Sequence, residues 1–556
     1  MEQALAAAQQ AGELPPFPTP AFEVEIPRSE QFGDYATNLA MVLAKHARRN
    51  PREVASILQR HLPEETDRWV ERVEIAGAGF INFYLKPGWA GEVVRHILQQ
   101  GEHYGEDTLG TGKRVLIEFV SANPTGPLTL GHGRNAAIGD TLARLLNALG
   151  YQVEREFYIN DGENSTQIRN FALSVLTRYR QLLGEHVEMP EDAYHGEYVM
   201  EIAHWIREQH GDHAAQGEPE AVLKRFEHWA KQLMLQEQER DLRDFGVQFD
   251  RWFSEQSLYN SGAVERALQR LREQGFAYEA EGALWLRSTA FGDEKDRVLV
   301  RANGLPTYLA SDVAYHLDKY ERGYDLLINL WGADHHGYVA RMKAAIAAMG
   351  YDPDRLVILI YQLVNLYRGT EPVRMSKRAG ELITLREVMD EIGVDALRFF
   401  YLLRSHDSPL DIDLDLAQEQ SEKNPVFYVQ YAHARICSIE RVASEQGVPI
   451  PTLDEANLNL LTHPEEVALI KRLAEFPEEV RFAGLQYAPH RLTSYALEVA
   501  RAFHGFYTEC RVLSDDTELT RARLLLVRAT RIVIRNALAL MGVSAPERME
   551  PRDTSA

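Results

Sequence analysis

The chain has 556 residues, 45% hydrophobic and 26% charged, which is typical of a globular protein. This length exceeds what one hydrophobic core supports, so we predict about three or four domains of roughly 150 residues each. The net charge of −22 argues against phosphate binding over the whole surface. The arginine-rich stretch 471–535 is the candidate for a local basic patch, and a solvated helix surface is its alternative.

The sequence also argues against membrane, secreted and zinc-cage proteins. Its longest apolar run, residues 356–363, is far shorter than the ~20 residues that a membrane helix needs. The N-terminus lacks the basic and then apolar pattern of a secretory signal. Cys437 and Cys510 are too few for a structural zinc site. We therefore expect a cytoplasmic protein with no membrane contact.

Residues 1–110 predict a self-contained α+β domain. Alternating apolar residues at 22–26 predict a strand, and apolar residues at helical spacing predict helices over 35–45 and 51–61. Residues 70–85 have the pattern of a β-hairpin that turns at its glycines.

A strand, a loop, a helix and a second strand follow. The apolar run 115–120 is typical of a buried parallel strand. Leucines at helical spacing then predict a helix, and Gly150 can take the positive-φ conformation that ends it. Residues 151–159 begin the next strand. Because open α/β sheets bind ligands at the carboxyl ends of their strands, the loop at 124–134 is a candidate ligand site.

The same pattern recurs further along the chain. Residues 161–278 are polar and helical in pattern and predict an insertion between two halves of one sheet. A strand at 326–330, a turn at 331–337, a helix closed by Gly350 and a strand from 356 form the second half. The repeat predicts a nucleotide-binding sheet.

The first loop holds Gly131, His132, Gly133 and Arg134 at the start of a helix. Glycines let the backbone approach a ligand closely, and the free amides of a helix N-terminus attract anions. A plain strand-to-helix turn is the alternative.

A second loop, residues 374–378, has three cations and a hydroxyl and is followed by Gly380. Nucleotidyl transfer depends on neutralising charge as it develops, so a cationic loop suits that chemistry. A solvated basic loop is the alternative. The chain beyond it is almost wholly helical in pattern, ending in an amphipathic helix at 519–541.

Together the two loops resemble the HIGH and KMSKS signatures of class I aminoacyl-tRNA synthetases, at residues 129–132 and 374–378. Other segments resemble the arginyl-tRNA synthetase family in particular, in that family's order over nearly the whole chain. They are 117–119, 121–127, 308–312, 332–336, 395–398 and 545–549.

The resemblance implies a multidomain α/β fold. It implies an N-terminal α+β domain at 1–110 that binds the tRNA elbow, and a Rossmann-like, doubly wound parallel-sheet catalytic domain at 111–390 with a helical insertion at about 162–278. A connecting segment at 391–420 and an all-α helical-bundle anticodon-binding domain at 421–556 would complete the chain.

The resemblance assigns the ATP site to both loops and to the second strand–loop unit. Its catalytic residues would be His132 and Lys377. Its ATP-binding residues would be Thr129, Gly131, His132, Gly332, Asp334, His335, Met375, Ser376 and Lys377. A polar turn or a metal pair is the alternative for residues 334–336.

An arginine pocket has a physical requirement as well. A guanidinium group calls for carboxylates in bidentate geometry. Glu118 and Asp312 match the family's guanidinium-binding positions, and Asn123 and Tyr308 would orient the substrate. The alternatives are a solvent-facing acid for Glu118 and a helix N-cap for Asp312.

For tRNA, the resemblance points to two groups of residues. Phe80 and Asn82 match positions that read the D-loop by stacking and hydrogen bonding. Tyr428, Tyr431 and Arg435 share one helix face that suits stacking on anticodon bases, and Tyr507 and Met549 join them as candidates. Core packing is the alternative for the aromatic residues.

One position departs from the family pattern. Thr129 stands where the first signature usually has His, and a hydroxyl donates a hydrogen bond but carries no charge. A catalytically silent, tRNA-binding paralogue is therefore the rival hypothesis. The joint presence of His132, Lys377, Glu118 and Asp312 argues against it. A cysteinyl enzyme is disfavoured because the cysteine ligands of its zinc are missing.

The resemblance also implies the reactants. ATP with Mg²⁺ would be a substrate complex, with no tightly bound cofactor and no structural zinc. The partners would be L-arginine and tRNA(Arg), and tRNA would have to bind before arginine is activated. We also expect a monomer.

Overall fold

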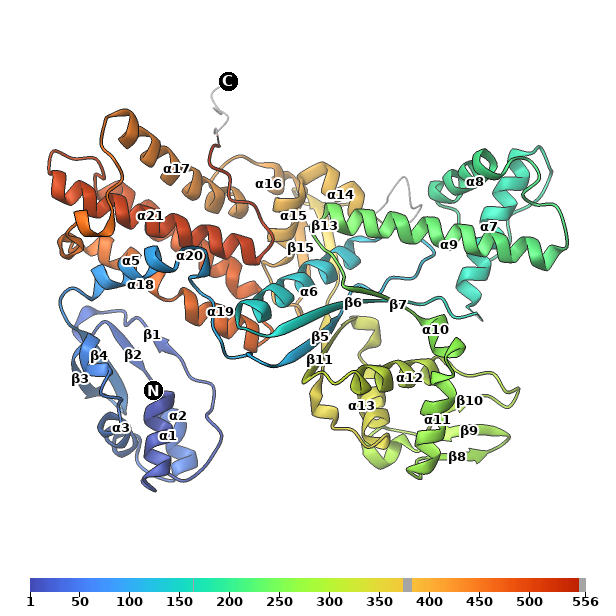
Figure 1. Cartoon of the computed structure of the whole chain (residues 1–556), viewed down its shortest axis with the longest axis horizontal. Coiled ribbons are helices and arrows are strands. Elements are labelled where there is room, and N and C mark those ends of the chain that lie inside the picture. Colours follow the sequence, from blue (N-terminus) through green and yellow to red (C-terminus); the bar gives the residue numbers. More distant parts are fainter. Residues whose placement is uncertain (164, 374–382, 550–556) are drawn as a thin grey trace. The chain divides into compact units, whose positions relative to one another are not determined.

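The computed structural model describes residues 1–163, 165–373 and 383–549, which form two compact units (Figure 1). Unit 1 contains residues 1–99, 450–471 and 511–526, and unit 2 contains the rest of the described chain. The division differs from the boundary predicted at residue 110. Gly91 packs against Leu458, and Lys471 pairs with Asp34 at 2.9 Å, so later segments complete unit 1.

Unit 1 has an antiparallel sheet of order β1-β2-β4-β3. The predicted hairpin is confirmed as β3 (Val70–Ala76) and β4 (Phe80–Leu85), and the predicted first strand as the shorter β1 (Val24–Glu25). Ile81 of β4 is buried in a core with Leu43 and Leu58. The helices of this unit are α1 (Glu2–Gln10), α2 (Leu39–Ala47), α3 (Pro51–Arg60), α4 (Thr66–Trp69), and most of α5 (Trp89–Gln100).

The helix predicted over 35–45 is partly wrong. Residues Tyr35–Thr37 form β2, which pairs with β4, and the helix begins only at Leu39. The hydroxyl of Thr37 donates to the carbonyl of Glu23 at 2.8 Å, which holds this segment in the sheet. Pairing with a strand more than 40 residues away decides the conformation, and local spacing does not reveal it.

Unit 2 contains a five-stranded, fully parallel sheet of order β12-β11-β5-β6-β7. The strands are β5 (Arg114–Glu118), β6 (Gln152–Ile159), β7 (Arg251–Ser254), β11 (Leu326–Gly332) and β12 (Leu356–Tyr361). Both predicted strand–loop–helix–strand halves are confirmed, with α6 (Leu130–Ala148) and α13 (Tyr338–Ala348) as their helices. This arrangement brings the loops after β5 and β11 to one edge of the sheet.

The segment predicted as a helical insertion contains one strand of the parallel sheet. Residues Arg251–Ser254 form β7, which pairs with β6, and Trp252 stacks on Phe157 with ring centroids 4.3 Å apart. The rest is helical as predicted. It comprises α7 (Thr166–Leu182), α8 (Glu197–His210) and α9 (Pro219–Asp244), which share a core of their own, and then α10 (Glu255–Asn260) and α11 (Ala263–Glu273).

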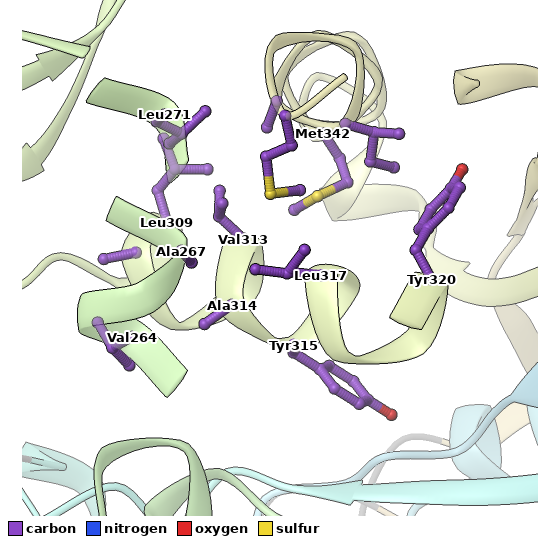
Figure 2. Close-up of a cluster of buried hydrophobic side chains, with 14 of the residues drawn as sticks. Val264, Ala267, Leu271, Leu309, Val313, Ala314, Tyr315, Leu317, Tyr320 and Met342 are labelled. Carbon is purple, nitrogen blue, oxygen red and sulfur yellow. The ribbon is translucent and has the colours of Figure 1, made fainter. Parts of the chain in front are cut away.

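Another hydrophobic core of unit 2 packs α12 (Tyr308–Glu321) against α11 and α13. Figure 2 shows Val313 and Leu317 on the side of α12 that faces Met342 of α13, while Tyr315 points away from them. The Tyr315 hydroxyl donates to Glu156 of β6 at 2.5 Å. Contacts on both sides therefore fix α12, and with it Asp312, against the sheet.

Two small sheets flank the main one. The first is antiparallel, with β8 (Ala277–Ala280), β9 (Ala283–Leu286) and β10 (Arg297–Val300). The second joins β13 (Val364–Arg368), β14 (Glu371–Val373) and β15 (Leu410–Asp413).

The later part of the chain is mainly helical, as predicted. Its helices are α14 (Leu385–Ile392), α15 (Val394–Tyr401), α16 (Leu414–Gln418), α17 (Pro425–Glu445), α18 (Pro464–Ala474), α19 (Phe476–Leu485), α20 (His490–Glu509) and α21 (Thr517–Leu540). Within the described residues, none of the helices combines the length and apolar character that crossing a bilayer requires.

Candidate active site

The first signature loop is hydrogen-bonded to the residues that follow the second. Thr129 and Thr384 form an isolated antiparallel bridge. The N–H of Leu130 donates to the carbonyl of Ile383 at 3.1 Å, and the N–H of Leu385 donates to the carbonyl of Leu128 at 2.8 Å. The segment that begins at Ile383, after the second loop, therefore lies beside the first loop. Residues 374–378, with Met375, Ser376 and Lys377, lie outside the described residues.

Thr129 and His132 cap the N-terminus of α6 together. The Thr129 hydroxyl accepts the N–H of His132, and Nδ1 of His132 accepts the N–H of Thr129 at 3.1 Å. Because Nδ1 accepts, the neutral ring carries its proton on Nε2. Burial lowers the pKa of His132 to about 4, so the imidazole is neutral at physiological pH and offers a hydrogen-bond donor rather than a charge.

A pocket of about 540 Å³ opens beside this cap. Four of the predicted ATP-binding residues line it, namely Thr129, Gly131, Gly332 and Asp334. A Cβ at Gly332 would lie 2.7 Å from a carboxylate oxygen of Asp334, so only glycine fits there without a shift. His335 is exposed and lies 3.4 Å from the same carboxylate.

Arg134, near the start of α6, does not line the pocket. Its side chain is fully buried and donates to the carbonyls of Gln362 at 2.8 Å and Ser405 at 2.9 Å. Gln362 lines the pocket. Arg134 therefore fixes the wall of the pocket at Gln362. Its donors are already bound to two backbone carbonyls, which compete with any anion for them.

The turn after β5 has a rare backbone conformation. Val120 and Ser121 are consecutive non-glycine residues with φ of 64° and 45°. Asn135 accepts the N–H of Val120 at 2.8 Å, and the Ser121 hydroxyl donates to Glu118 at 2.9 Å while accepting the N–H of Tyr158 at 3.1 Å. Such strained residues persist where the surroundings hold them, and they cluster at functional sites.

Asp312 lies inside α12, whose N-cap is Thr307, so the N-cap alternative for Asp312 is wrong. The Tyr338 hydroxyl donates to its carboxylate at 2.7 Å. Burial raises the pKa of Asp312 to about 7; the Tyr338 hydrogen bond opposes this rise, while the negative charges of Glu255 and Glu118 add to it. A guanidinium ion in this place would relieve the repulsion.

Glu118 is 6% exposed at the end of β5, so the solvent-facing alternative is wrong. Nζ of the fully buried Lys319 lies 2.8 Å from its carboxylate and 2.9 Å from Oδ1 of Asn329. Glu118 therefore already has a cationic partner, whereas the hydrogen bond to Asp312 comes from a neutral hydroxyl. The other two predicted arginine-binding residues are exposed, Tyr308 at 61% and Asn123 in the loop after β5.

Glu255 is a candidate that the sequence analysis missed. It is 4% exposed at the start of α10, and the N–H of Gly162 donates to its carboxylate at 3.2 Å. Burial raises its pKa, and its charge acts on Asp312. Glu255 directly follows the carboxyl end of β7, where parallel sheets bind ligands, so predicting β7 from the sequence would have made Glu255 a candidate.

The structure brings together four of the five predicted anticodon-binding residues. The Arg435 guanidinium lies between the rings of Tyr431 and Tyr507, 4.9 and 4.8 Å from their centroids. The ring of Tyr428 lies 4.9 Å from that of His504, which also stacks on Tyr431. These residues are half-buried or exposed, so they form a surface cluster rather than a core stripe.

The remaining tRNA candidates lie elsewhere. Met549 lines a separate pocket of about 710 Å³ together with Phe427 and Gln430. Phe80 and Asn82 share one face of β4 in unit 1, where Phe80 is half-buried and Asn82 is 3% exposed.

Three family models match the chain. They are the arginyl tRNA synthetase N terminal domain at residues 1–85, the class I (R) tRNA synthetase catalytic domain at 93–399, and the DALR anticodon binding domain at 429–549.

Whole-chain relatives agree with these models. An arginine–tRNA ligase of Carboxydothermus hydrogenoformans is 52% identical over 98% of this chain and 97% of its own, and one of Heliobacterium modesticaldum is 51% identical over 98% and 97%. The structure of Thermus thermophilus arginyl-tRNA synthetase superposes with a TM-score of 0.77 at 25% identity, over 99% of both chains. The chain belongs to the arginyl-tRNA synthetase family of class I aminoacyl-tRNA synthetases.

Proposed function

We propose that this chain activates L-arginine with ATP and transfers it to the terminal adenosine of tRNA(Arg). The observation that carries the arginine specificity is the half-buried Asp312, whose carboxyl accepts the Tyr338 hydroxyl and lies close enough to the acids Glu255 and Glu118 for their charges to raise its pKa. A guanidinium ion supplies Asp312 with positive charge and paired donors, while Lys319 is paired with Glu118.

In the first step, the carboxylate of arginine attacks the α-phosphate of Mg-ATP, and pyrophosphate leaves as arginyl-adenylate forms. ATP occupies the pocket beside α6, where Thr129, Gly131, Gly332 and Asp334 contact it. His132 donates a hydrogen bond from Nε2 to the phosphates, and Lys377 neutralises the charge that develops at the α-phosphate. The remaining ATP contacts come from His335, Met375 and Ser376.

Arginine binds with its guanidinium toward Asp312, and Glu255 serves as a second carboxylate. Glu118 pairs with Lys319 and accepts the Ser121 hydroxyl, and so fixes the backbone turn beside the proposed arginine site. Asn123 and Tyr308, which are both exposed, orient the substrate.

In the second step, a hydroxyl of the terminal adenosine attacks the carbonyl carbon of arginyl-adenylate and loses its proton, and the ester forms as the bond to phosphate breaks and AMP leaves. The cluster of Tyr428, Tyr431, Arg435 and Tyr507 stacks on anticodon bases, with Met549 as a further contact. Phe80 and Asn82 contact the D-loop. The enzyme acts as a cytoplasmic monomer and has the four domains inferred from the sequence. Its first step requires bound tRNA.

The test is ATP–pyrophosphate exchange and tRNA charging with each of the twenty amino acids, with and without tRNA. We expect arginine alone to be charged. Charging with another amino acid would refute the arginine assignment, and tRNA binding without charging would instead support the silent paralogue.

A further inference from the structure

Helix α9 belongs to the helical insertion, and it also contacts segments that carry the proposed arginine-binding residues. Near its N-terminus Phe226 is fully buried in the core of the insertion with Phe171 of α7. From there α9 runs toward α14 (Figure 1). Lys231, Gln238 and Asp241 follow at spacings of seven and three residues, which places them on one face of the helix.

Gln238 holds the loop between β5 and α6. Its side chain is fully buried, and Nε2 donates to the carbonyls of Asn123 at 2.9 Å and Gly126 at 2.8 Å. The Tyr198 hydroxyl of α8 donates to the carbonyl between them, that of Thr125, at 2.8 Å. The insertion therefore fixes three carbonyls of the loop that carries Asn123.

Lys231 holds the end of β6 near Glu255. Its Nζ lies 3.0 Å from the carboxylate of Asp161, at the end of β6. The same carboxylate accepts the Ser254 hydroxyl at 2.7 Å and the N–H of Gln256 at 3.2 Å. These two residues flank Glu255, so the position of Glu255 depends on Asp161 and its cation.

Asp241 extends the same face toward α14. Its carboxylate accepts Nε and Nη2 of Arg386 at 3.0 and 2.6 Å, and Asp244 accepts Nη2 at 2.6 Å. Arg386 lies two residues after Thr384, which caps α14.

We propose that α9 positions the arginine pocket, with Gln238 fixing the backbone at Asn123 and Lys231 fixing, through Asp161, the segment that carries Glu255. The inference rests on the arginine-binding role proposed above. Both are positioning residues, because their contacts are with protein groups that hold the substrate rather than with reacting atoms. A shift of the insertion would therefore change arginine binding before it changes ATP binding.

The first test compares Gln238→Met, which keeps the side-chain size but removes the donors, with Gln236→Met on the exposed face of the same helix. ATP–pyrophosphate exchange with the full-length enzyme and tRNA gives KM for each substrate. We expect the arginine KM to rise about tenfold in Gln238→Met, while the ATP KM changes less than about twofold. Equal changes in both, or no difference from Gln236→Met, would overturn the proposal.

The second test does not depend on a buried position. The Lys231 side chain is 29% exposed, and Lys231→Met is compared with Lys224→Met, which changes an exposed lysine of the same helix. We expect a rise of about three- to tenfold in the arginine KM for Lys231→Met, and recovery in Lys231→Arg. An arginine KM equal to that of Lys224→Met would refute the role of Lys231. Failure of the unaltered enzyme to activate arginine would refute the proposed function instead.

Discussion

Thr129 and Thr384 face each other across an antiparallel bridge, and each caps the helix that follows it. Thr129 forms its capping box with His132, and Thr384 forms one with Glu387. The threonine in the first signature thus has a structural reason, because Thr is a favoured N-cap whose hydroxyl satisfies a free helix amide. The residue that departs from the family pattern also contacts, through this bridge, the segment that follows the second loop.

This arrangement predicts the effect of removing the cap. Thr129→Val keeps the side-chain shape but loses the hydroxyl, and it should cost about 1 kcal/mol of stability and raise the ATP KM. Thr129→Ser should retain both properties. Calorimetry and exchange kinetics measure the two effects, and identical unfolding midpoints for the Val and Ser variants would show that the hydroxyl does not stabilise α6.

The carboxyl of Asp312 predicts a pH dependence. Its pKa of about 7 lies above the ordinary 3.8, so the folded state binds more protons between these values, and stability without arginine falls as pH rises through this window. Guanidinium binding needs the ionised form, so the arginine KM should fall as pH rises from about 6 to 8. Asp312→Asn should raise the KM and flatten its pH profile, with the ATP KM as internal control. A KM that ignores both pH and the substitution would exclude Asp312 from the pocket.

Lys377 is predicted to act on the reaction rather than on tRNA binding. Lys377→Ala should lower the rate of arginine activation by about 10²- to 10³-fold, because it removes the charge that stabilises the transition state. The tRNA Kd should change little. Lys113→Ala, at an exposed lysine before β5, is the control. Equal losses of rate and tRNA affinity would identify the second loop as a binding surface.

Arg435 is predicted to act on tRNA binding rather than on the reaction. Arg435→Ala removes the guanidinium between Tyr431 and Tyr507 and should raise the tRNA Kd about tenfold. Activation at saturating tRNA should stay unchanged. Arg441→Ala, on an exposed turn of the same helix, should leave the Kd within about twofold if stacking matters more than net charge. Equal effects of the two substitutions would indicate general electrostatic attraction.

The buried ion pair of Arg398 and Asp140 predicts a large stability effect. Arg398 is fully buried, contacts Asp140, and donates to the carbonyl of Met541 at 2.8 Å. Arg398→Met leaves a buried carboxylate without this partner and should cost about 3–5 kcal/mol. The exposed Arg49–Glu53 pair should contribute less than about 1 kcal/mol, so Arg49→Met serves as comparison. Calorimetric midpoints test the difference, and similar shifts for both variants would contradict it.

Local patterns predicted the central sheet well. A parallel strand is buried on both faces, so the continuous apolar runs of β5 and β11 are visible without knowledge of their neighbours. Gly150 likewise takes the predicted positive φ, at 90°, after the end of α6. Elements that depend on distant partners were missed. β7 has only four residues, and Tyr35–Thr37 is a strand only because it pairs with β4.

The candidate site followed the same rule. Thr129, Gly131, Gly332 and Asp334 were predicted from the family resemblance of short loop segments, and they line one pocket. The partners of buried charges were not visible. Lys319 lies 201 residues from Glu118, and the carbonyls that Arg134 binds lie 228 and 271 residues away. Charge pairing across such separations is decided by the folded sheet.

Unit 1 is built from three separate segments of the chain, and this has a consequence for how the protein folds during its synthesis. Its sheet and first helices lie within residues 1–99, but it also includes residues 450–471 and 511–526. The partner of Asp34 is Lys471, so the ribosome makes the whole parallel sheet before that ion pair can form. Because domains fold largely as they emerge, unit 1 waits for its last segments until the chain is almost finished. A truncated chain that ends after the parallel sheet would carry an incomplete N-terminal unit.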